Sequence, residues 1–183
     1  MFNLPNILTL SRGISALGVI CMLAVQGPNF YRYLLVIFIF AACTDYADGA
    51  LARKMKIVSD FGKVFDPLFD KVLVFVFLII LYPHGVVPQT IILLLIIRDL
   101  VIDALRSFFS TRGVVIPAIF TAKAKTVVTF MLITSALLEL SVSSPPSGLD
   151  DVTMILAWLA LGLSLISAMQ YGAIFAKAYK TTP

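Results

Sequence analysis

Four aspartates at the edges of two apolar segments are the residues of this sequence best suited to chemistry. They are Asp45 and Asp48 in one segment, and Asp66 and Asp70 in the next. Residues three or four positions apart share a face of an α-helix, so each pair would present two carboxylates to one side. Unpaired carboxylates at a membrane boundary are costly and indicate a functional site. Two such helices joined by a short basic segment would bring together four oxygen donors, a set that suits Mg²⁺, Mn²⁺ or Ca²⁺.

Small and basic residues accompany these carboxylates. Gly49 and Ala52 lie on or near the face of Asp45 and Asp48, where their missing bulk would let a ligand approach the helix backbone. The alternative is a chance cluster of helix-end charges neutralised by nearby basic residues, namely Arg53, Lys54, Lys63 and Lys71. Charges that only cap helices need no such spacing, so we favour the ligand site.

The spacing of eight residues in this region resembles a family signature. The sequence from Asp45 to Asp70 reads DYADGALARKMKIVSDFGKVFDPLFD. It contains D-x2-D-G-x2-A-R-x8-G-x3-D-x3-D without a gap, which is similar to the signature of the CDP-alcohol phosphatidyltransferase family. The matching residues are Asp45, Asp48, Gly49, Ala52, Arg53, Gly62, Asp66 and Asp70.

The resemblance implies an enzyme that transfers a phosphatidyl group from a CDP-linked lipid to an alcohol and releases CMP. It also implies a homodimer with a six-helix membrane fold, and two divalent metal ions, Mg²⁺ or Mn²⁺. The implied metal ligands are Asp45, Asp48, Asp66 and Asp70, of which Asp70 also serves as the general base. The implied contacts to the CDP-lipid are Asp45, Asp48, Gly49, Ala52, Arg53 and Gly62.

Composition favours a membrane protein made of helices. Of the 183 residues, 60% are hydrophobic and only 13% are charged. The apolar segments are long enough to cross a bilayer core of about 30 Å, which takes roughly 20 residues per helix. We therefore expect an all-α polytopic membrane protein, with residues 1–183 forming a single transmembrane domain of six helices. The expected spans are about 5–25, 31–53, 59–81, 87–109, 118–140 and 152–176.

A polar stripe runs along the first of these spans. Asn3, Asn6 and Thr9 follow one another at intervals of three residues, and Arg12 continues the stripe. Such a stripe either faces a ligand cavity or forms an interfacial entry to the membrane, and residue types alone favour neither. Together with the family resemblance, the stripe makes Asn6 and Thr9 candidate contacts to the CDP-lipid.

Basic residues gather on one side of the expected spans. That side carries the segment 53–63, Arg112 and a basic C-terminus, whereas the other side is mainly acidic, with Arg32, Glu139, Asp150 and Asp151. Cytoplasmic loops of membrane proteins carry an excess of Lys and Arg. We therefore predict that both termini and the active site are cytoplasmic, in a multi-pass protein of a bacterial cytoplasmic membrane.

Three residues that often carry chemistry are interpreted here as structural. Cys21 and Cys43 fall inside apolar segments, and we predict that they are small buried packing residues rather than a disulfide or a metal pair. His84 is the only histidine and follows Tyr82-Pro83, a sequence typical of a turn. We interpret it as a solvated turn residue.

A charged stripe in the fourth span bears on the acceptor. Asp99, Asp103 and Arg106 recur at helical spacing, with Arg98 beside Asp99, and the four charges could neutralise one another as internal ion pairs. Such internal ion pairing is compatible with a role of these residues in a ligand-binding site. The Arg98-Asp99 pair followed by Arg106, the sequence AKAKT at residues 122–126 and the opening NLPNILTLSR resemble the phosphatidylglycerophosphate synthase subgroup of the family.

The subgroup resemblance implies CDP-diacylglycerol as donor and glycerol 3-phosphate as acceptor. The implied ligands of the acceptor phosphate are Arg98, Arg106, Lys123 and Lys125. Inositol phosphate and phosphatidylglycerol are alternative acceptors, the latter giving a CDP-diacylglycerol-dependent cardiolipin synthase. A small ion-coupled transporter is a remote alternative, because the charges gather on one side without an internal repeat. The remaining expected partners are membrane lipids, and the sequence contains no nucleic-acid-binding motif.

Overall fold

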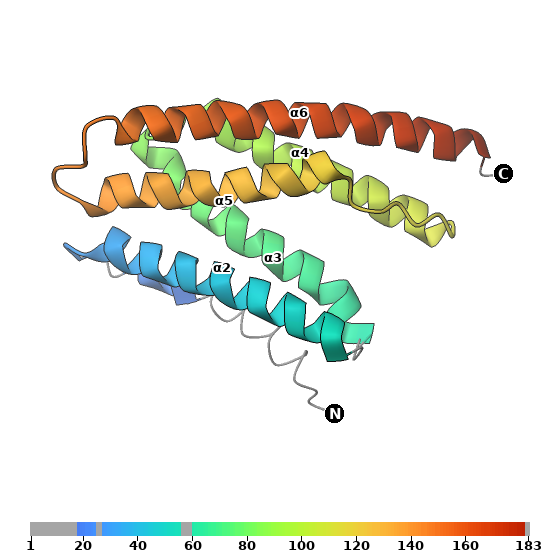
Figure 1. Ribbon diagram of the computed structural model, residues 1–183, viewed down its shortest axis with the longest axis horizontal. Coiled ribbons are helices and arrows are strands. Elements are labelled where there is room, and N and C mark those ends of the chain that lie inside the picture. Colours follow the sequence, from blue (N-terminus) through green and yellow to red (C-terminus); the bar gives the residue numbers. More distant parts are fainter. Residues whose placement is uncertain (1–17, 25–26, 56–59, 182–183) are drawn as a thin grey trace. The chain divides into compact units, whose positions relative to one another are not determined.

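All regular secondary structure in the described part of the protein is helical. The computed structural model describes residues 18–24, 27–55 and 60–181, and the side chains of residues 18–24, 27–44 and 71–179. No β-strand occurs within these ranges, so the all-α prediction is confirmed. The elements are α2 (Phe30–Met55), α3 (Asp60–Leu81), the short 3-10 helix η1 (Tyr82–His84), α4 (Gln89–Thr111), α5 (Phe120–Ser141) and α6 (Leu149–Thr181) (Figure 1).

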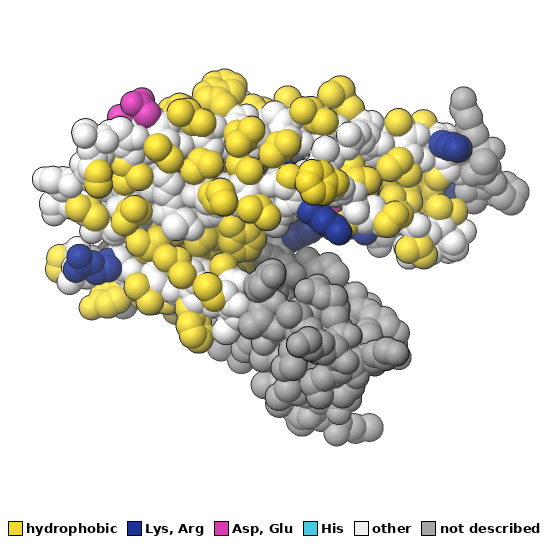
Figure 2. Space-filling model, in the orientation of Figure 1, with side chains coloured by type: hydrophobic (Ala, Val, Ile, Leu, Met, Phe, Trp, Pro, Cys, Tyr) yellow, Lys and Arg dark blue, Asp and Glu magenta, His cyan; other side chains and the backbone are white. Residues whose placement is uncertain are grey.

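The predicted second to sixth spans correspond to α2 to α6, and their ends agree within a few residues. Most of the predicted first span lies outside the described residues. Two of the described helices are long and apolar enough to cross a membrane, Phe120–Ser141 and Leu149–Tyr179. On α6 large apolar side chains such as Ile155, Trp158 and Met169 are exposed, and Figure 2 shows hydrophobic side chains over much of the visible surface. An exposed apolar face of this kind suits a lipid environment better than water.

By the packing of its backbone the chain forms two compact units, residues 1–81 with 133–147 and residues 82–132 with 148–183. In the first unit α2 packs against α3. Phe38 and Phe77 meet edge to face with ring centroids 4.7 Å apart, and both are fully buried. Such an arrangement of two aromatic rings is favourable beyond the area that it buries.

In the second unit α4 packs along α6. The buried residues in the first 19 residues of α6 are small, namely Thr153, Ala157, Ala160, Ser164 and Ser167. Small residues let helix backbones approach closely, which is how membrane helices associate. Toward the C-terminal end of α6, Phe175 stacks on Phe109 of α4 with ring centroids 5.3 Å apart, and Ile116 of the α4–α5 loop joins the same hydrophobic cluster. This cluster fixes the loop against both helices.

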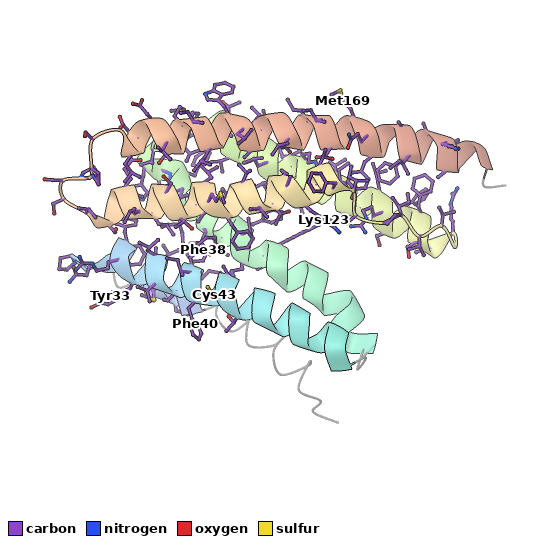
Figure 3. The ribbon with its side chains drawn as sticks, in the orientation of Figure 1. Tyr33, Phe38, Phe40, Cys43, Lys123 and Met169 are labelled. Atoms are coloured by element: carbon purple, nitrogen blue, oxygen red, sulfur yellow. The ribbon has the colours of Figure 1, made fainter. Side chains whose placement is uncertain are left out.

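The prediction that both cysteines are buried is wrong. Cys21 and Cys43 are free thiols with exposed side chains. Figure 3 shows Cys43 on the outer side of α2 with Tyr33 and Phe40, whereas Phe38 points inward. An apolar segment of a membrane protein has two apolar surroundings, the protein interior and the lipid. Hydrophobicity alone therefore does not separate a buried position from a lipid-facing one.

Candidate active site

The eight signature residues lie on two consecutive helices of the first unit. Asp45, Asp48, Gly49, Ala52 and Arg53 belong to α2, and Gly62, Asp66 and Asp70 belong to α3. The side chains of all eight lie outside the described part, as do the candidate nucleotide contacts Asn6 and Thr9 in their entirety. The first five residues of the signature thus lie on α2, and the last three lie on α3.

A buried group of charged side chains joins α4 to α5 in the second unit. Asp99 accepts hydrogen bonds from Arg98 Nη1 at 2.9 Å and from Lys125 Nζ at 2.5 Å. The side chains of Arg98, Asp99 and Lys125 are only 13%, 11% and 6% exposed. Arg98 Nη2 also donates to Ser167 Oγ on α6 at 2.7 Å. One carboxylate therefore connects α4 with α5, and one guanidinium connects α4 with α6.

These three charged side chains are suited to receive an anion. Two are cationic and one is anionic, so together they carry a net positive charge. A guanidinium has several N–H donors, and the buried Nε of Arg98 has no hydrogen-bond partner among the described residues. Positive charge and spare donors match a phosphate group.

Arg106 lies two turns beyond Arg98 and contacts the α4–α5 loop. Its Nε and Nη2 atoms both donate to the backbone carbonyl oxygen of Ile116, at 3.2 and 3.0 Å. Its side chain is half-buried. Arg106 therefore holds the loop that leads into α5, and it retains N–H donors beyond these two bonds.

Lys123 is the exposed member of the predicted acceptor group. It lies in the first turn of α5 and projects from the helix in Figure 3, whereas Lys125 is buried against Asp99. The four predicted acceptor ligands, Arg98, Arg106, Lys123 and Lys125, thus come from two helices of the same compact unit.

Two residues of α6 contact this group although the sequence reasoning did not select them. Ser167 accepts the hydrogen bond from Arg98, and the guanidinium carbon of Arg98 lies 5.8 Å from the ring centroid of Tyr171. The Tyr171 hydroxyl also accepts a hydrogen bond from the backbone amide of Ile119 at 3.3 Å. The signal that could have found them is the spacing of Ser164, Ser167 and Tyr171, which places polar groups on one face of an otherwise apolar helix.

A family model agrees with the signature. The model for the CDP-alcohol phosphatidyltransferases matches residues 2–166, which include all eight signature residues as well as α4 and α5. The chain belongs to the CDP-alcohol phosphatidyltransferase family. It is therefore a transferase of phospholipid biosynthesis, and its apolar helices agree with a membrane enzyme.

Relatives within the CDP-alcohol phosphatidyltransferases resemble the chain over nearly its whole length. A protein of Rickettsia typhi is 37% identical over 175 residues, which cover 93% of this chain and 96% of the relative. A protein of Bacillus subtilis is 33% identical, with both chains covered in full. Each of these relatives is named CDP-diacylglycerol–glycerol-3-phosphate 3-phosphatidyltransferase.

Proposed function

We propose that the protein transfers the phosphatidyl group of CDP-diacylglycerol to glycerol 3-phosphate, giving phosphatidylglycerophosphate and CMP. The observation that carries this proposal is the similarity to relatives of that name over nearly the full length of both chains. The basic residues of α4 and α5 support it, because they would suit an acceptor that carries a phosphate.

We propose that Asp45, Asp48, Asp66 and Asp70 hold two divalent ions, Mg²⁺ or Mn²⁺. Four carboxylates are the donor type that these ions prefer. The contact between Phe38 and Phe77 supports their convergence. Asp45 lies seven residues after Phe38, and Asp70 lies seven residues before Phe77. On each helix the aspartate is therefore nearer than the phenylalanine to the segment that connects α2 and α3. Seven residues make about two helical turns, or about 10 Å, so each aspartate position shares the face of its phenylalanine.

In the proposed reaction Asp70 accepts the proton of the acceptor hydroxyl. The hydroxyl oxygen then attacks the phosphorus of the phosphatidyl group, and the bond from that phosphorus to the CMP oxygen breaks. Bound metal ions supply charge neutralisation of the pyrophosphate and of the leaving group. Gly49, Ala52, Arg53 and Gly62, with Asn6 and Thr9, bind the CDP-lipid. This assignment gives every residue of the signature a role in one reaction.

We propose that Arg98, Arg106, Lys123 and Lys125 bind the phosphate of glycerol 3-phosphate. Arginine can grip a phosphate through paired donors, and lysine adds a mobile point charge. A phosphorylated acceptor must also approach four carboxylates, which is unfavourable without compensating positive charge. The net positive charge of Arg98, Asp99 and Lys125 together supports this assignment.

Replacing Arg106 with alanine is expected to raise the KM for glycerol 3-phosphate by about tenfold or more, since a charge-assisted hydrogen bond to an anion would be lost. The KM for CDP-diacylglycerol should change much less. Arg112→Ala is the matched control, because Arg112 is exposed and its guanidinium lies over the Phe108 ring. Steady-state kinetics with each substrate varied in turn gives both values. An Arg106→Ala enzyme with an unchanged acceptor KM would remove Arg106 from the subsite.

We propose a homodimer whose single domain, residues 1–183, crosses the bacterial cytoplasmic membrane six times, with both termini and the segment 53–63 in the cytoplasm. The asymmetry of basic residues supports this orientation. In intact cells an impermeant thiol reagent should label Ser144→Cys and not Lys56→Cys, in a background with both native cysteines replaced. Labelling of Lys56→Cys from outside would reverse the orientation.

Metal-dependent release of CMP tests the proposed chemistry. Purified protein given CDP-diacylglycerol and glycerol 3-phosphate should release CMP when Mg²⁺ or Mn²⁺ is present, and chelation with EDTA should stop the release. Restoring the metal should restore it. If no CMP appears with either metal, the proposed transferase reaction is wrong for this protein.

A further inference from the structure

We infer that α6 supplies two positioning residues, Ser167 and Tyr171, which hold the Arg98 guanidinium in the orientation that binds the acceptor phosphate. This inference rests on the proposed function, because it concerns the acceptor subsite of that reaction. Neither residue belongs to the signature, and both lie about 70 residues beyond Arg98 in the chain. They act through Arg98 and are not assigned a contact with the reacting atoms.

Ser167 is oriented by its own hydrogen bonds. Its side chain is fully buried, and its hydroxyl donates to the backbone carbonyl oxygen of Leu163 at 2.7 Å. Because the hydroxyl proton is used in this way, the oxygen meets Arg98 Nη2 as an acceptor, at 2.7 Å. The α6 backbone therefore fixes the direction of the lone pair that receives the guanidinium.

Tyr171 connects Arg98 with the beginning of α5. It is only 2% exposed, and its ring lies beside the Arg98 guanidinium. Its hydroxyl accepts from the amide of Ile119, whose own carbonyl accepts from the Lys123 amide at 3.2 Å in the first turn of α5. One side chain of α6 thus contacts both the guanidinium of α4 and the helix end that carries Lys123 and Lys125.

Together these contacts restrain the guanidinium on three sides. Asp99 binds Nη1, Ser167 binds Nη2, and Tyr171 lies beside the group. Paired recognition of a phosphate depends on the plane of the guanidinium, whereas simple attraction depends only on its charge. Removing a restraint from α6 leaves the charge of the subsite unchanged but lets this plane rotate. The expected defect is therefore weaker acceptor binding with little change in the chemical step.

Ser167→Ala and Ser164→Ala form a matched pair for the test. Ser164 is also buried on α6, three residues earlier, but its hydroxyl has no hydrogen-bond partner within the described part of the chain. Ser167→Ala should raise the acceptor KM about fivefold to tenfold, as expected for a lost hydrogen bond to a charged group. The kcat and the KM for CDP-diacylglycerol should stay within about twofold, and Ser164→Ala should leave all three values near those of the wild type.

Tyr171→Phe removes the hydroxyl that anchors the ring to the amide of Ile119, which loosens the ring beside Arg98, so it provides a second test should Ser167→Ala fold poorly. Its control is Tyr179→Phe, because Tyr179 lies on the same helix with its side chain 66% exposed. Tyr171→Phe should also raise the acceptor KM selectively, and its Tm in detergent should be close to that of the control. If Ser167→Ala and Tyr171→Phe leave the acceptor KM equal to that of their controls, or change both substrate KM values equally, the inference is wrong.

The acceptors that the wild-type enzyme uses show whether a failed test concerns this inference or the proposed function. Turnover with glycerol 3-phosphate supports the proposed function. The ratio of the acceptor KM of each variant to that of its control then decides the inference. A wild type that uses a different phosphorylated alcohol overturns the proposed function alone, and the same ratios are measured with that alcohol. A wild type that uses only acceptors without a phosphate overturns both.

Discussion

Replacing Asp70 with asparagine is expected to lower kcat by roughly 10²- to 10⁴-fold, the usual contribution of general acid–base catalysis. Asparagine has nearly the same size but cannot accept the proton of the acceptor hydroxyl at neutral pH. Because three other carboxylates of the signature remain, binding of the CDP-lipid should largely survive. Asn variants of Asp45, Asp48 and Asp66 should instead lose metal affinity together with activity.

The measurement for Asp70→Asn is kcat with both substrates saturating, combined with direct binding of CDP-diacylglycerol. Asp60→Asn is the matched control, since Asp60 begins the same helix and is not part of the signature. The control should retain activity close to that of the wild type. Near-normal turnover of Asp70→Asn would show that another group accepts the proton.

Asp99→Asn is expected to reduce the free energy of unfolding by about 3–5 kcal/mol, as found when one partner of a buried ion pair is removed. Asp99 is the carboxylate that both Arg98 and Lys125 contact, and all three side chains are largely buried. Without it, two buried cations would face each other at close range. Denaturant unfolding in detergent micelles measures the loss.

Asp150→Asn provides the control for this prediction, because Asp150 is exposed in the first turn of α6. Its effect should stay within about 1 kcal/mol, the usual size of a surface charge near a helix end. Adding Lys125→Met to Asp99→Asn should recover part of the lost stability, since one unpaired cation is then removed. If Asp99→Asn unfolds at the same denaturant concentration as Asp150→Asn, the ion pairs contribute little to folding.

The features of this protein that were predictable from sequence are those set by neighbouring residues. Apolar segments of about 20 residues predicted the positions of α2 to α6, because helix length and bilayer thickness are linked. The signature is likewise local, since its eight residues fall within residues 45–70 on two consecutive helices. Local spacing therefore sufficed for the family, which the family model confirmed.

Contacts between distant helices were not predictable in the same way. The bond between Asp99 and Lys125 joins residues 26 positions apart, and that between Arg98 and Ser167 joins residues 69 positions apart. Helical periodicity gives the face on which a residue lies, but not the helix that this face meets. For the same reason the sequence identified the charged stripe of α4 and missed its partners on α6.

The most direct test of the central claim is product analysis with labelled CDP-diacylglycerol. Purified wild-type protein with Mg²⁺ in mixed micelles is offered glycerol 3-phosphate, inositol phosphate or phosphatidylglycerol in separate reactions, and the lipid products are resolved by chromatography. We predict labelled phosphatidylglycerophosphate with glycerol 3-phosphate, one CMP released per product, and little product from the other two acceptors. Robust product from inositol phosphate or phosphatidylglycerol with none from glycerol 3-phosphate would contradict the proposed function.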